Sequence, residues 1–206
     1  VEVGLKMALQ AHHNLGEHQR RHFVAFEGAY HGDTVGAMSV GERGVFNEPF
    51  WSLLFDSTVL PYNDAQALRD HLKAHGDSVA GVIMEPLVQG AGGMVFSDVS
   101  YLRECSDICR EFGVYFILDE VMTGWGRTGT LFACEQAGIT PDILAASKGI
   151  TGGTLPLGLT VCTPSIYEAF LGDRKTDAFL HGHSYTGNPI ACAASLAALS
   201  LYEEEG

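Results

Sequence analysis

The sequence predicts an α/β protein in which helices cover both faces of a mostly parallel sheet. Short apolar runs of strand length alternate along the chain with stretches of helical periodicity. Most of these runs are apolar on both faces, which is typical of parallel strands buried between helices. Glu85, Asp119 and Lys148 each follow such a run. Because the carboxyl ends of parallel strands meet at one edge of a sheet, we expect these ionisable groups to converge on a ligand site there.

The first half of the chain alternates helix and strand signals. The expected elements are an opening helix in the first ten residues, a strand at 23–26 that leads into a turn at 28–32, a helix at 64–74, and a strand at 79–84.

The second half continues the alternation. A helix is indicated by apolar residues at helical spacing, and Gly113 follows where a helix would end: Val99, Leu102, Cys105, Cys109 and Phe112. Strands are expected at 114–118, 143–146 and 157–162, the last of them rich in β-branched residues and followed by a helix at 165–171.

The last helix has a clear start. Asn188 suits the N-cap and Pro189 the first helical position. One apolar stripe is then expected along the helix: Ile190, Ala194, Ala197 and Leu201.

Composition excludes several classes of protein. The chain has 206 residues, of which 46% are apolar and 18% charged, so it can bury a sizeable core and is not a disordered chain. The formal charge of −13 opposes nucleic acids and anionic membranes, and we expect neither as a partner. The five cysteines lack metal-binding spacing and indicate a reducing, cytoplasmic location without zinc. No signal peptide or apolar run of membrane-spanning length is present in the sequence.

The ends of the sequence suggest a fragment. Helical periodicity begins at Val1 without an initiating methionine, and the acidic stretch that ends the sequence follows a helix directly. No linker, internal repeat or low-complexity stretch interrupts residues 1–206, so we expect part of one large domain.

Asp119 and Lys148 carry the chemistry of the expected site. A buried acid at a strand end and a lysine in a glycine-flanked loop are what a pyridoxal 5'-phosphate (PLP) site requires, because that cofactor is held as a Schiff base on lysine while a carboxylate keeps its ring nitrogen protonated. For Asp119-Glu120 alone, two solvated acids at a strand end are the favoured interpretation. The glycine-rich loop 121–129 that follows, with its tryptophan and arginine, favours the functional interpretation.

Two further segments have both a functional and a purely structural interpretation. Tyr30 either stacks on a planar cofactor or belongs to an ordinary turn. The loop 181–189 leads into a helix N-terminus and is either an anion site or a plain capped loop.

His71 and His75 have helical i,i+4 spacing without further ligands, and we expect them on a solvated helix face.

Five motifs together resemble the class III PLP-dependent aminotransferases. They are Tyr-His-Gly-Asp-Thr (30–34), Glu-Pro-Leu-Val-Gln-Gly-Ala-Gly-Gly (85–93), Leu-Asp-Glu-Val-Met-Thr-Gly-Trp-Gly-Arg-Thr-Gly (118–129), Ser-Lys-Gly-Ile-Thr-Gly-Gly (147–153) and His-Gly-His-Ser-Tyr-Thr-Gly-Asn-Pro (181–189). The resemblance covers nearly the whole chain. It implies the large PLP-binding domain of fold type I over residues 1–206, without the family's N-terminal part and C-terminal small domain.

The resemblance also implies roles for individual residues. It makes Lys148 the Schiff-base lysine and proton shuttle, and Asp119 the partner of the pyridinium nitrogen. Tyr30 and Val121 would cover the two faces of the ring.

A further set of roles is implied for the loop 181–189. Ser184 stands where the family usually has a threonine that binds the cofactor phosphate of the neighbouring subunit, and His183 beside it would also belong to the cofactor site. Active sites would then form across a homodimer interface. Gly182 would line the substrate pocket together with Tyr30 and Lys148.

Within the family, the likeness is greatest to the biotin-synthesis branch. It rests on Gly-Asp-Thr-Val-Gly-Ala-Met-Ser-Val-Gly (32–41), on Leu-Phe-Ala-Cys-Glu (131–135) and on the Gln-Gly-Ala-Gly-Gly-Met and His-Gly-His-Ser-Tyr-Thr-Gly-Asn loops. It implies transfer of an amino group to 8-amino-7-oxononanoate, a keto acceptor, with S-adenosylmethionine as donor. The alternatives are another ω-aminotransferase acting on ornithine, 4-aminobutyrate, a diamine or lysine, and an inactive PLP-fold fragment.

The sequence departs from the family at three places. The Gly-Ser phosphate loop would lie just upstream of Val1, and the arginine that meets a substrate carboxylate would lie in the small domain. Related enzymes often have a glutamine at the position of Met122, where it contacts the ring hydroxyl.

Overall fold

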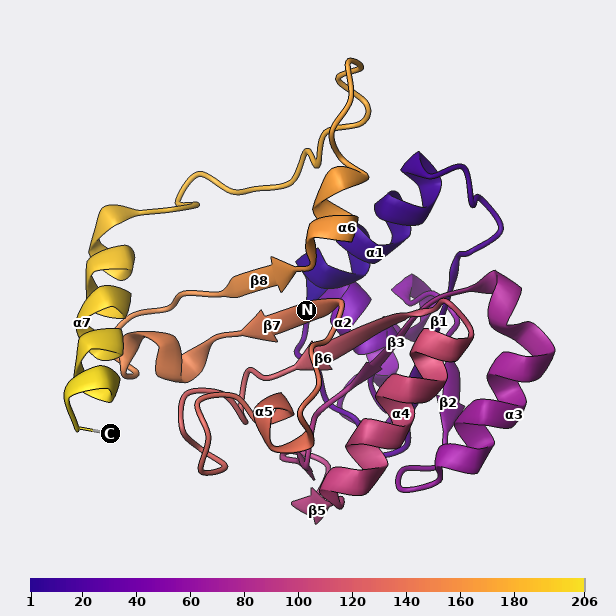
Figure 1. Cartoon of the computed structure of the whole chain (residues 1–206), viewed down its shortest axis with the longest axis horizontal. Coiled ribbons are helices and arrows are strands. Elements are labelled where there is room, and N and C mark those ends of the chain that lie inside the picture. Colours follow the sequence, from indigo (N-terminus) through magenta and orange to yellow (C-terminus); the bar gives the residue numbers. More distant parts are fainter. Residues whose placement is uncertain (206) are drawn as a thin grey trace.

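A six-stranded sheet forms the centre of the molecule, whose computed structural model describes residues 1–205 (Figure 1). The strand order is β2-β1-β3-β6-β7-β8; all neighbours are parallel except β8, which runs antiparallel to β7. The strands are β1 (His22–Phe26), β2 (Thr58–Leu60), β3 (Val79–Met84), β6 (Tyr115–Asp119), β7 (Ile143–Ala146) and β8 (Leu159–Cys162), and a separate hairpin joins β4 (Val88–Gln89) to β5 (Val95–Phe96).

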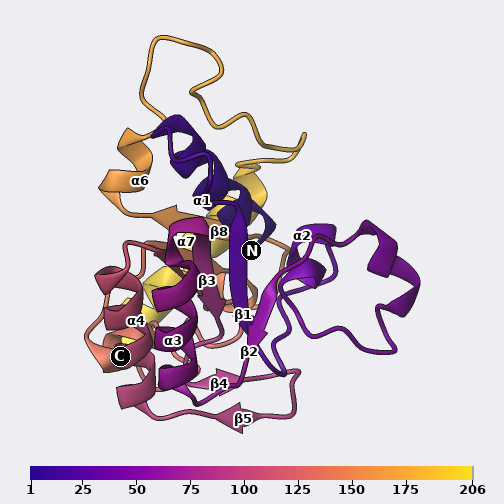
Figure 2. The ribbon, with the colours of Figure 1, turned by 90° about the vertical axis from the view of Figure 1, so that its right-hand side faces the viewer.

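Helices cover both faces of this sheet, as the sequence predicts (Figure 2). α3 (Ala65–His75) and α4 (Val99–Glu111) contribute to one core, whereas α1 (Glu2–Asn14) and α6 (Pro164–Glu168) contribute to the other. The remaining helices are α2 (Val35–Ser39), α5 (Cys134–Ala137), α7 (Pro189–Glu205) and the 3₁₀ turns η1 (Glu48–Leu53), η2 (Gly76–Ser78) and η3 (Lys148–Thr151).

The central strands are apolar on both sides because each side faces a core. In β3 all six residues are buried; Val82 and Met84 point to the core of α3 and α4, while Ile83 points to the core of α1. Fully burying a side chain of this size contributes roughly 1.5–3 kcal/mol. The buried central strands therefore fix the position of the residues that follow their carboxyl ends.

Several helix boundaries follow from local chemistry. The Asp64 carboxylate accepts a hydrogen bond from the Ala67 backbone N–H at 2.9 Å and starts α3, and Asn188 Oδ1 accepts one from Ala191 N–H at 2.9 Å at the start of α7. Gly113 adopts φ +63° just after α4, a left-handed conformation that suits glycine.

The structure also corrects some expectations. β8 begins at Leu159 rather than at 157, and α6 ends at Glu168 rather than at 171. Strand β2 was not predicted from the sequence. In α7 the buried residues include Ala191 and Ala198, whereas two members of the expected stripe, Ile190 and Leu201, are 71% and 55% exposed.

His71 does not lie on a fully solvated face as predicted. Its Nε2 is buried without a hydrogen-bond partner among the described residues, and its ring centroid lies 5.0 Å from that of His75. Burial, followed by the nearby His75 and His22, lowers the pKa of His71.

No helix within residues 1–205 combines the length and the apolar character that crossing a bilayer would demand.

Candidate active site

The carboxyl ends of β3, β6 and β7 bring the predicted residues to one edge of the sheet (Figure 1). Glu85 follows β3, Asp119 is the last residue of β6, and Lys148 opens η3 shortly after β7. Asp119 is paired in register with Ala145 of β7, and the Glu120 N–H donates to the Ala145 carbonyl at 2.8 Å. The pairing of β6 with β7 therefore places the acid and the lysine on neighbouring strand ends.

Asp119 is buried and held by two hydrogen bonds. Its side chain is only 5% exposed; Oδ1 accepts the Val121 backbone N–H at 3.0 Å, and Oδ2 contacts His31 Nδ1 at 2.7 Å. An ionised carboxylate only accepts hydrogen bonds, so His31 Nδ1 carries the hydrogen. Each oxygen keeps a further lone pair, and the carboxylate can still accept a hydrogen bond from a protonated ring nitrogen.

His31 is the residue that sequence reasoning missed at this site. It lies in the loop after β1, its side chain is fully buried, and its Nε2 has no partner among the described residues. The available signal was indirect: a buried acid requires a donor, and the histidine next to Tyr30 was a candidate donor.

Glu120 has a structural role that excludes the alternative of two solvated acids. It is fully buried, and its carboxylate accepts hydrogen bonds from Thr123 Oγ1 at 2.7 Å and from the backbone N–H groups of Ala133 and Cys134 at 2.9 and 2.8 Å. Glu120 therefore closes the loop that contains Val121.

Glu85 is a third buried carboxylate at this edge. It accepts the backbone N–H groups of Tyr30 at 3.1 Å and Gly90 at 2.9 Å. Burial raises its pKa, and Asp119 adds to the increase, while the two backbone donors and His31 oppose it.

Lys148 faces a cavity that it shares with the loop after β6. The cavity has a volume of about 780 Å³, and its lining includes Val121, Met122, Trp125 and Lys148. The Lys148 backbone has φ +49°, a left-handed conformation that is strained for a residue with a Cβ and is often found at functional sites. Gly149 allows the close approach of Trp125, because a Cβ at this position would lie 2.7 Å from Trp125 Cβ.

Met122 and Tyr30 lie in the loops that follow β6 and β1. The Met122 side chain packs over Gly90, where an added Cβ would overlap its sulfur. Tyr30 is 45% exposed, and its hydroxyl donates to Asp33 at 3.2 Å.

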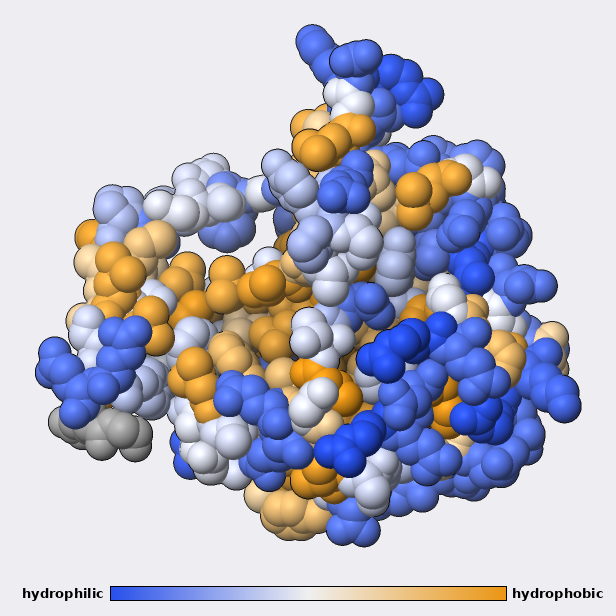
Figure 3. All heavy atoms as spheres, viewed as in Figure 1, coloured by the Kyte–Doolittle hydropathy of each residue, from blue (hydrophilic) through white to orange (hydrophobic). Residues whose placement is uncertain are grey.

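Gly182, His183 and Ser184 do not join this group of residues. All three are exposed and belong to the extended segment that leads into α7 (Figure 1). A hydrophobic hollow lies beneath this segment and beside α7 (Figure 3), with His183, Leu157 and Ile190 in its lining.

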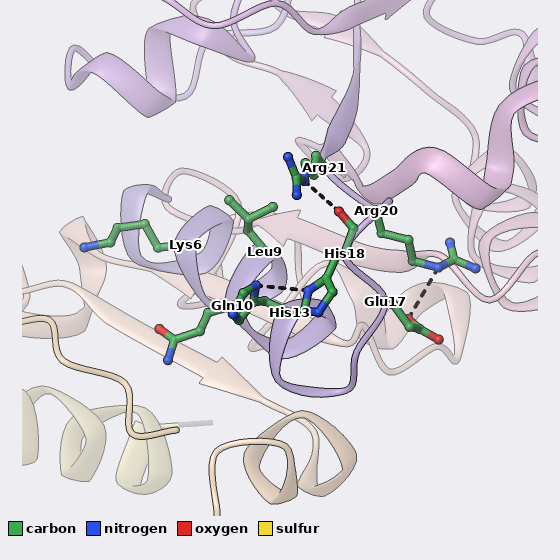
Figure 4. A pocket seen from close by; sticks show the side chains of 8 residues that line it. All are labelled: Lys6, Leu9, Gln10, His13, Glu17, His18, Arg20 and Arg21. Carbon is green, nitrogen blue, oxygen red and sulfur yellow. Dashed lines mark hydrogen bonds and ion pairs between the residues drawn. The ribbon is translucent and has the colours of Figure 1, made fainter. Parts of the chain in front are cut away.

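A separate pocket of about 500 Å³ lies on α1 and the loop that follows it (Figure 4). It contains none of the predicted site residues. Its basic side chains are already engaged: Lys6 contacts His181 at 2.8 Å, Arg20 donates to the Gly76 and Val79 carbonyls, and Arg21 donates to the His18 carbonyl at 2.6 Å. Such a pocket offers few free donors for a ligand.

Comparison with known proteins identifies the family. The profile of class-III aminotransferases matches residues 1–206. The chain belongs to the class-III aminotransferase family. It is 51% identical to the adenosylmethionine-8-amino-7-oxononanoate aminotransferase of Synechococcus elongatus over 98% of its own length and 50% of that protein.

Solved structures agree with this assignment. The enzyme of the same name from Methanocaldococcus jannaschii matches with a TM-score of 0.95 and 40% identity, covering 100% of this chain and 49% of that one. An amine transaminase from an uncultivated Pseudomonas species in its PLP-bound form matches with a TM-score of 0.90 and 36% identity, covering 99% and 50%. The chain thus spans about half the length of the relatives it matches.

Proposed function

We propose that this protein uses PLP to transfer an amino group to 8-amino-7-oxononanoate, forming 7,8-diaminononanoate for biotin synthesis, with S-adenosylmethionine as the donor. The observation that carries the proposal is the placement of a buried, hydrogen-bonded Asp119 and the exposed Lys148 on neighbouring strand ends. The names of the relatives, with 37–51% identity, support the substrate.

The residues present fit the cofactor. Asp119 has free acceptor capacity in a buried setting, Lys148 offers an amine beside a cavity, and Tyr30 is an aromatic side chain that is partly exposed. Bound PLP acts as an electron sink for the carbanion formed when a donor amine loses its Cα proton.

The chain's own groups would perform the remaining work. Lys148 would be the amine that attaches the cofactor and would carry the proton taken from the donor's Cα. Asp119, whose carboxylate is buried, would keep the ring nitrogen protonated by accepting its hydrogen bond. Tyr30 and Val121 would cover the two faces of the ring.

Gly182, His183 and Ser184 serve the neighbouring subunit of a homodimer in this proposal. Their exposure, on the extended segment that leads into α7, supports a role in a second active site. Sedimentation at micromolar concentration tests the dimer, and a monomer would contradict the shared site. We also propose a cytoplasmic location.

The first experiment concerns the cofactor. Purified protein is mixed with PLP, reduced with borohydride and digested, and the modified peptide is identified by mass spectrometry. We expect the label on Lys148 and its loss in Lys148→Ala, while Lys73→Ala, a change at another exposed lysine, keeps it. A label that survives Lys148→Ala would refute the attachment and favour an inactive PLP-fold protein.

The second experiment concerns the substrate. The polypeptide that carries this sequence is incubated with PLP, S-adenosylmethionine and 8-amino-7-oxononanoate, and 7,8-diaminononanoate is measured by mass spectrometry. The similarity to an amine transaminase supports one alternative, a broader ω-aminotransferase. Turnover of simple amines, ornithine or 4-aminobutyrate without any diaminononanoate would favour that alternative.

A further inference from the structure

We propose that Glu85 is a positioning residue that ties the loop carrying Tyr30 and His31 to the sheet and thereby sets the orientation of Asp119. The role in cofactor binding rests on the proposed function, whereas the tie itself is a property of the chain alone.

The carboxylate of Glu85 serves two different loops with its two oxygens. Oε1 accepts the Tyr30 N–H from the loop after β1, and Oε2 accepts the Gly90 N–H from the hairpin of β4 and β5. Both partners are backbone donors, so they fix the path of the chain rather than one side chain. A glutamine has a single acceptor oxygen and an NH₂ group, and it cannot satisfy both donors from the same position.

The two loops also touch each other directly. Gln89 Nε2 donates to the Glu27 carbonyl at 2.8 Å, and a Cβ at Gly92 would overlap the carbonyl oxygen of Gly28. Glu85 therefore ties together two segments that are already in close contact, and movement of one displaces the other.

The tie reaches Asp119 through His31. His31 directly follows Tyr30, whose N–H is held by Glu85, and its Nδ1 donates to Asp119 Oδ2 at 2.7 Å. Because the His31 side chain is fully buried, its ring has little freedom to compensate for a shift of its backbone. A displaced loop would lengthen this hydrogen bond and rotate the carboxylate.

The cost of burying Glu85 supports a specific role. Burial raises the pKa of Glu85, and the backbone N–H groups of Gly90 and Tyr30, which favour the ionised carboxylate, oppose that increase. No lysine or arginine pairs with it among residues 1–205; the two backbone N–H groups are the partners that its carboxylate meets.

Amide hydrogen exchange without cofactor tests the tie. In Glu85→Gln we expect the exchange rate of Tyr30 N–H, Gly90 N–H or both to rise about tenfold or more, since a donor is left unpaired. Asp142→Asn is the matched control. Asp142 also has a pKa raised by burial, and it accepts one backbone N–H, that of Phe116, at 2.8 Å. It lies just before β7, at the opposite end of the strands from Glu85. This control should leave Tyr30 and Gly90 unchanged.

Binding of PLP then tests the consequence for Asp119. We expect Glu85→Gln to retain borohydride labelling of Lys148 but to bind PLP about tenfold more weakly, with an altered visible circular dichroism band; Asp142→Asn should keep both affinity and band. Unchanged exchange at Tyr30 and Gly90 in Glu85→Gln would overturn the tie. Faster exchange with unaltered affinity and band would overturn the link to Asp119.

If Glu85→Gln does not fold, hydrogen exchange of the wild-type chain tests the tie made by Glu85. Tyr30 and Gly90 N–H should then show comparable protection, well above that of free loop amides. Free-loop exchange at either amide would refute the tie. These measurements need no cofactor, so they stand even if Lys148 takes up no PLP and the proposed function fails.

Discussion

Replacing His31 tests how the buried carboxylate of Asp119 is held. His31→Phe keeps a ring in the buried space but removes the Nδ1–H donor at 2.7 Å from Oδ2. Nε2 has no partner among the described residues, so its loss breaks no further hydrogen bond. A hydrogen bond to a charged group contributes about 1.5–3 kcal/mol, and we expect His31→Phe to lower the free energy of unfolding by about 2 kcal/mol.

Urea denaturation of the cofactor-free chain measures this loss. With a slope near 2 kcal/mol/M, a loss of about 2 kcal/mol lowers the midpoint by about 1 M. His31→Asn is the informative counterpart, because its side-chain NH₂ can occupy the place of Nδ1–H. His75→Phe, on an exposed histidine, is the control for the chemical change itself.

PLP affinity shows whether the Nδ1–H donor of His31 or the packing of its ring is the property that matters. We expect His31→Phe to weaken PLP binding by about 10- to 100-fold, whereas His31→Asn stays within a few-fold of wild type. If His31→Phe matches wild type in both midpoint and affinity, the hydrogen bond does not hold Asp119. If His31→Asn is as weak as His31→Phe, packing of the ring is the relevant property.

Three further changes test other parts of the structure. Lys148→Gly should unfold with a free energy about 0.5–1 kcal/mol higher than Lys148→Ala, because glycine adopts φ +49° without strain; equal urea midpoints would contradict a left-handed backbone there. Gly92→Ala should lower the unfolding free energy by at least about 2 kcal/mol, because the overlap is with backbone and no side-chain rotation relieves it, and Gly44→Ala, with open space around it, is the control. The lowered pKa of His71 means that the unfolded chain binds its proton more readily, so stability should fall as pH decreases below the ordinary value of 6.5, and His71→Gln should reduce that dependence in urea titrations at several pH values.

The strand ends were predictable because their signals are local. Each apolar run can be identified as a buried strand from its own composition. Asp119 follows one such run directly, and Lys148 follows another after Ser147. Once parallel pairing is assumed, their meeting at one edge follows without further information. The short strand β2 gave no such signal, because it has only three residues and lies at the sheet edge, where Val59 is exposed.

Other features depend on contacts between distant parts of the chain. His31 and Asp119 are separated by 88 residues, and no local pattern connects them. The antiparallel direction of β8 is set by its pairing with β7, which composition alone does not determine. In α7, small and large apolar residues occur all round the helix, so the sequence did not reveal that Ala191 and Ala198 are the residues that pack inward.

The three buried carboxylates at this edge of the sheet differ in the hydrogen-bond donors that they accept. Glu85 and Glu120 accept backbone N–H groups with both of their oxygens, and each closes a loop. Asp119 accepts one backbone N–H and one imidazole N–H, and neither lysine nor arginine pairs with any of the three within residues 1–205. Carboxylates gathered in a buried place repel one another, so a cation at this edge would relieve an electrostatic cost that the fold already bears. A protonated pyridine nitrogen beside Asp119 has the charge and the hydrogen that this arrangement accepts.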